Sequence, residues 1–436
     1  MSVVTDPVHE VLPDEPEQPR SWRVDTRPLR ESRDFRIIWT SGLVTYFGSI
    51  ATYVALPFQI KELTGSLALA GLLSAVEIVP LVLFGLWGGA IADAFDRRRT
   101  VLVCELLMLF MSGGLLANAL LDEPHVWLLF VIAALFATAD ALQRPSLDAL
   151  IQQVVPHRQM TAASALSSIR YSIGSIAGPA LAGVLLTVGS TWMAYGFDVL
   201  TYVGSLLILL RLGHIAAPAG DVASLRGVVE GIRYAVSRKD LLGTYAVDVL
   251  AMVFGMTTAI FPFVATVYGA PWAVGLLYAA ESVGSLAVSL TSGWTARVHR
   301  QGRAIGFAAA GFGLAIVCFG LAPNIWFALA ALVVAGATDM TSGIFRTAMW
   351  NQSIPMHLRG RMAGVEMLSY SVGPIVGNAR SGLVASATSV RFAIVSGGAL
   401  CVLSVAAAAS LMKEFRAYDE RSSPHAIQER AARGES

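Results

Sequence analysis

Residues 71–93 of the chain read GLLSAVEIVPLVLFGLWGGAIAD, and residues 275–297 read GLLYAAESVGSLAVSLTSGWTAR. The two stretches align without gaps at a separation of 204 positions and share nine of 23 residues, among them Glu77 with Glu281. Chance similarity between two hydrophobic helices would rarely match an embedded glutamate, because charged residues are rare in such helices. The chain is therefore predicted to contain two related halves, a feature of membrane transporters built by duplication.

A second block supports the same repeat at a separation of 199 positions. Its matched pairs are Asp140 with Asp339, Gln153 with Gln352, and Pro156 with Pro355. The segments around these pairs are predicted to occupy equivalent places in the two halves.

The composition is that of a polytopic membrane protein. Of 436 residues, 55% are hydrophobic and 14% are charged, against roughly 25% charged residues in an average soluble protein. The net charge of +1 leaves no basic field to attract nucleic acid as a partner. Three cysteines, Cys104, Cys318 and Cys401, lie in apolar runs, so neither a disulfide framework nor a metal site is expected.

Apolar stretches of spanning length, about 20 residues, recur twelve times between two polar ends. The expected spans are 35–60, 67–92, 100–121, 126–152, 161–188, 192–211, 241–268, 272–296, 304–322, 324–350, 361–387 and 392–412. We therefore predict an all-α membrane protein with twelve transmembrane helices in two pseudo-symmetric six-helix bundles. The predicted units are a disordered tail (1–34), the first bundle (35–211), a linker with a short amphipathic helix (212–240), the second bundle (241–412) and a second disordered tail (413–436).

Lysine and arginine predict the orientation, because they are retained on the cytoplasmic side. Of 31 such residues, 27 fall in the tails and in the loops and span ends of one side. Only Lys61 and Arg391 fall on the other side. Both termini are therefore expected in the cytoplasm, with the protein in the plasma (inner) membrane.

The loop after the second span reads GGAIADAFDRRR over residues 88–99. In it, Gly89 is followed four residues later by Asp93 and then by a basic cluster that includes Arg97 and Arg98. This pattern resembles the signature loop of the major facilitator superfamily, and its variant form is similar to that of the branch with enterobactin exporters and drug-efflux proteins. The resemblance implies secondary active transport by two bundles that rock around a central cavity.

The signature loop is expected to form a cytoplasmic gate. Asp93 is placed where a carboxylate can face the positive N-terminus of a helix from the other half. Arg97 and Arg98 can form charge-assisted pairs with a second carboxylate, and the resemblance implies that Asp148 is this partner. The alternative is that the arginines only fix the topology.

The fifth span carries small residues and a proline at Gly174, Gly178, Pro179 and Gly183. Small residues let helices approach closely, and proline removes a backbone donor and kinks the helix. The pattern is similar to the antiporter motif of exporters in the superfamily. Ordinary packing between membrane helices is the alternative.

Charged residues inside spans are functional candidates, because their burial in lipid is costly. The candidates for a proton or substrate role are Glu77, Glu281, Asp140, Arg144, Asp339, Asp248 and Arg170. For each, a structural ion pair is the alternative. Arg380, near the outer end of its span, is expected to extend toward the membrane surface.

Glu77 is the predicted proton carrier, possibly together with Glu281. Neither glutamate has a basic residue nearby in its own helix, and burial without a cation favours the neutral form. Asp140 differs, because Arg144 follows it by one helical turn and is expected to hold it ionised.

Two other classes of membrane protein conflict with the sequence. A pump with its own ATP site needs a lysine after glycine in a P-loop, yet Lys61, Lys239 and Lys413 all follow other residues. All seven histidines fall in tails, loops or span ends, which leaves no axial pair for a buried haem.

We therefore predict a transporter rather than an enzyme, a monomer without a cofactor. Its predicted partners are a small-molecule substrate, protons and the lipid bilayer. It is expected to export a small hydrophobic or amphiphilic molecule of the drug or siderophore type by proton antiport. Proton-coupled uptake of a small metabolite and a channel-like facilitator are the alternatives.

Overall fold

The computed structural model describes residues 25–94, 96–156, 159–213, 232–355 and 358–432, and every regular element within these ranges is a helix. Among them, eleven helical segments are long and apolar enough to span a membrane. The remaining predicted span, the eleventh (361–387), coincides with α14 (Arg359–Ala387), whose length is ~44 Å at ~1.5 Å per residue. The predicted all-α fold is thereby confirmed.

The N-terminal bundle contains six long helices after one short helix. They are α1 (Arg27–Glu31), α2 (Arg33–Thr64), α3 (Leu67–Ala94), α4 (Arg97–Ala119), α5 (Val126–Val154), α6 (Met160–Val188) and α7 (Thr191–Leu209). Side-chain oxygens cap two of them: Ser32 accepts from the amide of Phe35, and Asp96 accepts from the amide of Arg99, each at 3.1 Å. Such caps satisfy amides of the first turn that have no partner within the helix.

The C-terminal bundle repeats this plan, but two of its spans are interrupted. Its elements are α9 (Lys239–Gly255), η2 (Thr258–Ile260), α10 (Phe261–Val267), η3 (Pro271–Ala273), α11 (Val274–Thr291), η4 (Ser292–Arg297), α12 (Gln301–Leu321), α13 (Ile325–Ser353), α14, α15 (Val390–Leu411), α16 (Lys413–Ala417) and α17 (Pro424–Ala432). The seventh span is α9, η2 and α10 together, and the eighth is η3, α11 and η4.

Side chains of α14 hold the break in the seventh span. Asn378 Oδ1 accepts hydrogen bonds from the hydroxyl of Thr258 and the amide of Ala259, each at 3.0 Å. Arg380 donates to carbonyl oxygens at the end of α9, including that of Phe254 at 2.7 Å. Free backbone groups at membrane depth need such partners, because no water reaches them. The side chain of Arg380 therefore points into the protein. The prediction that it extends toward the membrane surface was wrong.

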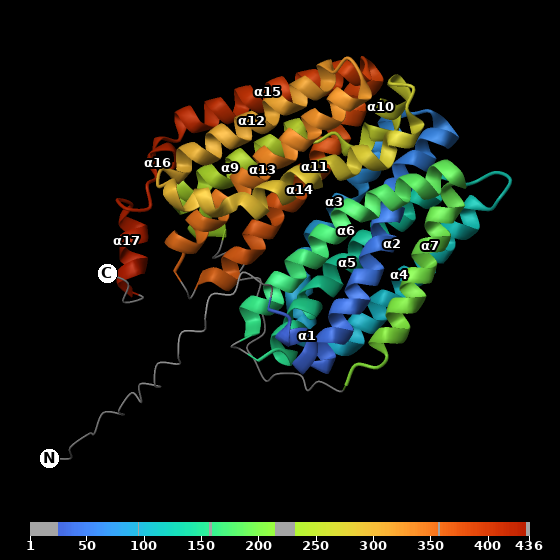
Figure 1. Cartoon of the computed structure of the whole chain (residues 1–436), viewed down its shortest axis with the longest axis horizontal. Coiled ribbons are helices and arrows are strands. Elements are labelled where there is room, and N and C mark those ends of the chain that lie inside the picture. The colour runs from blue at the N-terminus through green and yellow to red at the C-terminus, as the bar shows by residue number, and fades with distance from the viewer. Residues whose placement is uncertain (1–24, 95, 157–158, 214–231, 356–357, 433–436) are drawn as a thin grey trace.

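The two bundles meet at one end and diverge at the other (Figure 1). Two helix pairs join them, α3 with α14 and α6 with α11. The repeat relates these pairs, because α3 corresponds to α11 and α6 to α14. In Figure 1 the first and last described helices, α1 and α17, lie at the diverging end, which the lysine and arginine count predicts to be cytoplasmic.

The ends of the chain differ from the predicted disordered tails. At the N-terminal end, α1 and the start of α2 are helical, and at the C-terminal end α16 and α17 follow the last span. The predicted linker helix falls mostly on residues 214–231, which lie outside the described residues, and residues 232–237 are helical.

The segment after α15 docks on the helix ends of the C-terminal bundle at the diverging end. Phe415 is fully buried and packs against Gly243 of α9. Glu420 accepts hydrogen bonds from Gln301 at 2.8 Å and from Gln352 at 2.7 Å. Tyr418 is also buried, and burial raises the pKa of its hydroxyl to about 12. These contacts order a segment whose polar composition predicts disorder.

Candidate transport pathway

The two bundles touch backbone to backbone at two glycine pairs. A Cβ atom added to Gly71 of α3 would lie 2.8 Å from the Cα of Gly382 in α14. A Cβ atom added to Gly183 of α6 would lie 2.8 Å from the Cα of Gly275 in α11. Both distances are shorter than a side chain tolerates, so these helices make contact only because glycine occupies the four positions.

The sequence repeat relates the two glycine pairs. Gly71 and Gly275 are matched in the first aligned block, and Gly382 follows Gly183 by 199 residues, the separation of the second block. Sequence reasoning did not single out Gly382, although this separation was the signal that could have found it. The two contacts are therefore equivalent under the pseudo-symmetry of the fold.

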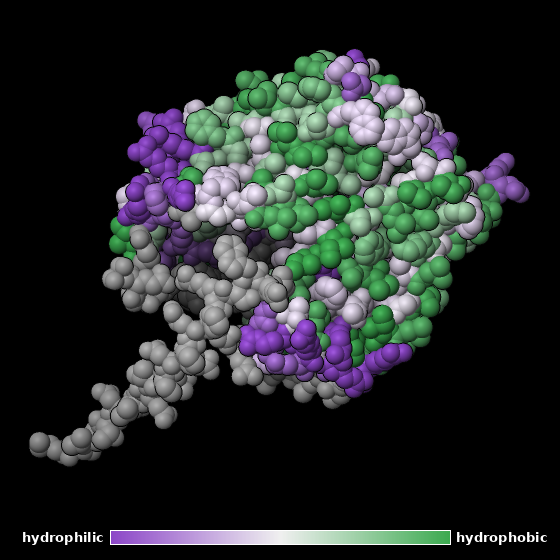
Figure 2. Space-filling view, viewed as in Figure 1, coloured by the Kyte–Doolittle hydropathy of each residue, from purple (hydrophilic) through white to green (hydrophobic). Residues whose placement is uncertain are grey.

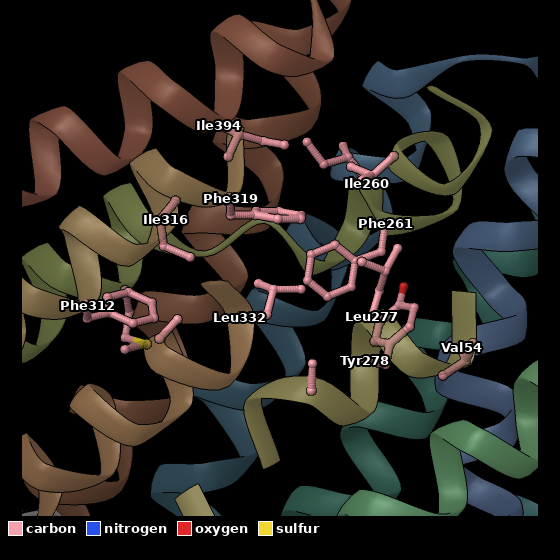
Figure 3. Close-up of a cluster of buried hydrophobic side chains, with 14 of the residues drawn as sticks. Val54, Ile260, Phe261, Leu277, Tyr278, Phe312, Ile316, Phe319, Leu332 and Ile394 are labelled. Carbon is pink, nitrogen blue, oxygen red and sulfur yellow. The ribbon is translucent and has the colours of Figure 1, made fainter. Parts of the chain in front are cut away.

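Aromatic side chains fill the end where the bundles meet (Figure 3). The hydroxyl of Tyr53 in α2 lies 3.2 Å from that of Thr258 in the C-terminal bundle, and its ring centroid lies 5.9 Å from that of Tyr278. Phe261 contacts Tyr278 and Phe319 at centroid distances of 5.0 and 5.8 Å. These contacts, with the glycine pairs, close this end of the pathway.

The space between the bundles is open at the opposite end, where Figure 2 shows a recess between them. Asp140 and Arg144 of α5 form an ion pair at 2.8 Å, with side chains 43% and 55% exposed. Tyr171 of α6 and Tyr370 of α14 are also exposed, and Arg144 lies within electrostatic range of both. Because these tyrosines belong to different bundles, Arg144 lies in the wall between them.

The repeated glutamates have equivalent neighbours. Glu77 is within electrostatic range of Asp140, and Glu281 is within range of Asp339. Both glutamates are also within electrostatic range of Tyr53, at the closed end. Each repeated glutamate thus lies in the same bundle as a repeated aspartate and within its electrostatic range.

Asp248 has a cation that sequence reasoning did not assign to it. Its carboxylate forms an ion pair with Arg346 of α13 and accepts a hydrogen bond from Ser369 of α14 at 2.8 Å. Asp248 is 1% exposed, so the pair lies inside the bundle. The sequence held a signal for this. Arg346 lies two helical turns after Asp339, a predicted embedded residue of the same helix, so Arg346 could also have been considered as an embedded residue.

Arg170 packs along α2 rather than across the pathway. A Cβ atom added to Gly42 would collide with the guanidinium of Arg170. Asp148, which is exposed on α5, feels the positive charges of both Arg144 and Arg170.

Part of the signature loop lies outside the described residues. The helix α3 continues to Ala94, but the surroundings of Gly89 and the side chain of Asp93 fall in the range that is not described. Beyond it, Arg98 donates to the carbonyl oxygen of Leu210 at 3.4 Å. Pairing of Arg97 or Arg98 with Asp148 stays a prediction.

The small residues of the fifth span face protein on two sides. Gly174 and Gly178 face α2, where a Cβ atom on Gly178 would lie 2.9 Å from Cγ2 of Ile50. Gly183 faces α11 of the other bundle. Pro179 lies inside α6 between these two contact regions.

Comparison with known proteins identifies the family. A family model described as transmembrane secretion effector matches residues 25–432. The chain belongs to this family of major facilitator superfamily transporters. As a family member it is a transporter and not an enzyme, and the spans found here make it a multi-pass membrane protein.

Curated relatives of this family member cover most of its length. It is 26% identical over 398 residues to the enterobactin exporter EntS of Shigella boydii serotype 4, across 88% of this chain and 94% of the relative. It is 27% identical over 392 residues to the enterobactin exporter EntS of Citrobacter koseri, across 88% and 93%.

Solved structures share the superfamily fold. A bacterial homologue of the lysosomal transporter Spinster aligns with a TM-score of 0.71 at 15% identity, over 87% of this chain and 96% of the other. A bacterial homologue of the iron transporter ferroportin aligns with a TM-score of 0.67 at 14% identity, over 88% and 98%. These similarities support the fold of two six-helix bundles.

Proposed function

We propose that this transporter exports a small amphiphilic molecule by alternating access, in exchange for protons. The observation that carries the proposal is the pair of repeat-related glycine contacts at one end of the molecule, opposite the recess at the other end. Such an arrangement suits a two-state device, in which one end of a central pathway closes while the other opens.

The conformation described here corresponds to the inward-facing state in this proposal. The glycine pairs lie at the end predicted to be extracellular, and the recess opens on the side of the chain termini. To face outward, Gly71 must separate from Gly382 and Gly183 from Gly275. The cytoplasmic ends must then approach, and there Asp93, with the neighbouring arginines and Asp148, would form the gate.

The open wall suits an amphiphilic substrate. Arg144 offers a guanidinium that binds oxygen-rich or anionic groups, and arginine also stacks on aromatic faces. Tyr171 and Tyr370 add apolar ring surface with a hydroxyl at the edge. The curated relatives are named as enterobactin exporters, which favours export over uptake and makes a siderophore the first substrate to test.

Proton coupling in this proposal uses the repeated glutamates. Glu77 and Glu281 each have a carboxylate neighbour, Asp140 or Asp339, rather than a bonded cation. A negative charge nearby and the absence of a bonded cation both favour proton binding by a glutamate, because they oppose its ionisation. Release of that proton to the cytoplasm would accompany loading of the substrate.

The test is accumulation of enterobactin and a panel of amphiphilic dyes in cells with and without the protein. Export predicts lower accumulation when the protein is present, and loss of that difference when an uncoupler collapses the proton gradient. Higher accumulation would favour uptake. If the protein only speeds the approach of the substrate to equal concentrations inside and outside the cell, and the uncoupler has no effect on this, a facilitator would be favoured.

A further inference from the structure

A series of hydrogen-bonded polar side chains lies between α2, α4 and α7, away from the space between the bundles. We call it the polar seam. The helix α7 packs against both α2 and α4, and the facing sides of the three helices carry carboxyl and hydroxyl groups about every turn. From Thr45 to Glu62, the rise along α2 is ~26 Å, most of the ~30 Å hydrocarbon core.

The cytoplasmic part of the polar seam is built around Glu105 of α4. Its Oε1 accepts a hydrogen bond from Thr45 at 2.8 Å and another from Ser205 of α7. Its Oε2 accepts one from Gln143 of α5 at 2.7 Å. Glu105 is 3% exposed, so hydroxyl and amide groups replace water around this carboxyl group. On α5, Gln143 follows Asp140 by three residues, so the two residues are neighbours on the helix surface.

The outer part is built around Asp198 of α7, which is fully buried. Its Oδ2 accepts hydrogen bonds from Thr52 at 2.6 Å and from Ser112 of α4 at 2.5 Å. Its Oδ1 is buried without a hydrogen-bond partner among the described residues. An unsatisfied carboxylate oxygen in an apolar bundle is costly, and binding a proton removes its charge.

Further hydroxyl groups lie along α2 and α7 between the two carboxyl groups and toward the outer surface. The hydroxyl of Tyr202 lies 3.0 Å from that of Ser49 and donates to Sδ of Met108 at 3.3 Å. Beyond Asp198, the hydroxyl of Tyr195 donates to Gln59 at 2.8 Å. The last contact is from Thr191 to Glu62 at 3.0 Å, and Glu62 is exposed.

The charged surroundings of the polar seam are acidic. Among the described residues, no lysine, arginine or histidine forms an ion pair with Asp198 or Glu105. Tyr195 and Tyr202 of α7 are within electrostatic range of Asp198, and Cys104 of α4 is within range of Glu105. Glu62 of α2 is within range of Tyr195, and Asp140 of α5 is within range of Cys104 and Tyr202. The nearest cation of α6, Arg170, lies against Gly42 instead.

We propose that the polar seam is a proton path through the N-terminal bundle, in which Asp198 and Glu105 are the two proton-holding groups. A proton entering beside Glu62 binds Asp198 at Oδ1. A hydroxyl group then relays it by accepting a proton on its oxygen and releasing its own, by way of Ser49 and Tyr202, to Glu105. From there the proton reaches Asp140 on α5, and each step moves one proton between oxygens without other chemistry. The inference rests on the proposed proton antiport and adds a route separate from the recess.

The first test uses the purified protein in liposomes, with the variants Asp198→Asn and Glu105→Gln. We expect proton-driven export to fall at least about tenfold in each, while substrate counterflow, which needs no net proton movement, changes less than about twofold. Infrared spectra at neutral pH should lose a carbonyl band of a protonated carboxylic acid in Asp198→Asn. Retention of both the band and the driven rate would overturn the proposal.

Two further variants separate a proton path from ordinary polar packing. Tyr202→Phe removes the hydroxyl between the carboxyl groups and keeps the ring, so driven export should slow while the infrared band stays. Ser41→Ala removes a buried hydroxyl of α2 outside the polar seam and should leave both transport modes unchanged. Equal loss of driven export and counterflow in Tyr202→Phe would mean that the polar seam only packs helices. If the carboxyl variants fail to fold, Tyr202→Phe decides.

The wild-type protein separates this inference from the proposed function. If its export ignores the proton gradient, the antiport proposal fails and the path has no use. If its export follows the gradient but Asp198→Asn and Glu105→Gln remain fully driven, only the path fails.

Discussion

The two bundles share a helix plan, a glycine contact and a repeated glutamate, but their buried carboxyl groups have opposite partners. In the C-terminal bundle, Asp248 is bonded to Arg346. In the N-terminal bundle, Asp198 and Glu105 are held by hydroxyl and amide groups. Asp248 is thus compensated by a full positive charge, whereas hydroxyl and amide dipoles alone compensate Asp198 and Glu105. The halves have kept a common contact surface while their charge compensation has diverged.

Removing the cation from the C-terminal bundle should have the largest effect. Arg346→Met leaves Asp248 buried and unpaired, which should lower the free energy of unfolding by about 3–5 kcal/mol. Thermal unfolding in detergent measures the change. The double variant Asp248→Asn with Arg346→Met should recover most of the loss. Unchanged stability in the single variant would show that the ion pair does not fix this bundle.

Enlarging the glycines at the closed end tests the equivalence of the halves. Gly71→Val and Gly275→Val should each destabilise the closed contact by ~1–3 kcal/mol, a shift of about 5- to 160-fold toward the outward-open state. Labelling from outside of a cysteine at Thr258, in a background without the native cysteines, measures this shift. Gly113→Val is the control, because a Cβ atom there meets no neighbour. A strong effect of one variant alone would break the equivalence.

Neutralising the repeated glutamates tests whether both halves share in coupling. Glu77→Gln should reduce proton-driven export about tenfold or more with counterflow retained, because the carboxyl group that takes the proton is lost. Glu281→Gln should have a smaller effect of the same kind. Export assays in liposomes with an imposed pH gradient measure both. Undiminished driven export in the double variant would remove these residues from the coupling mechanism.

The signature loop offers a sharper contrast, since it occurs in one half only. Asp93 corresponds to Arg297 under the repeat. Asp93→Asn should slow transport about fivefold without reducing membrane insertion. The interaction of a carboxylate with a helix N-terminus contributes ~1 kcal/mol, and its loss corresponds to about this change in rate. Arg297→Gln should leave the rate within about twofold. Poor insertion of Asp93→Asn would instead support a role in topology alone.

The smallest effect is expected at the exposed ion pair of the recess. Arg144→Gln removes the partner of Asp140, but both side chains are about half exposed. The free energy of unfolding should therefore change by less than about 1 kcal/mol, far less than in Arg346→Met. Side-by-side thermal unfolding of the two variants tests the contrast, and comparable losses would contradict it.

The sequence predicted much of the fold, because repeats and spanning segments are properties of single helices. The shared glutamates and glycines located α3 and α11 as equivalents. The glycine contacts themselves could not be predicted. Gly71 contacts a residue more than 300 positions away, and the packing of the helices determines which residues meet. For the same reason, Asp248 was recognised as embedded, but Arg346 was counted with the basic residues at the end of its span.

Other differences come from backbone groups that no side-chain pattern records. Arg380 was assigned to the membrane surface because its place in the span suggested it. The break after Gly255 creates free carbonyl groups inside the bundle, and these attract its guanidinium. Likewise, the segment after Met412 is polar on average, yet the burial of Phe415 and Tyr418 and the hydrogen bonds to Glu420 anchor it.

The hydrogen bonds from α14 to the break in the seventh span have a mechanical consequence. Asn378, Arg380 and Gly382 lie within about one helical turn of α14. The residues that hold η2 and the end of α9 and the residue that touches α3 therefore belong to one rigid segment. When α14 withdraws from α3, it must carry the broken end of the seventh span with it. A compound that binds beside Asn378 from outside would therefore immobilise both α14 and the seventh span through one contact. It would hold the transporter in a single state.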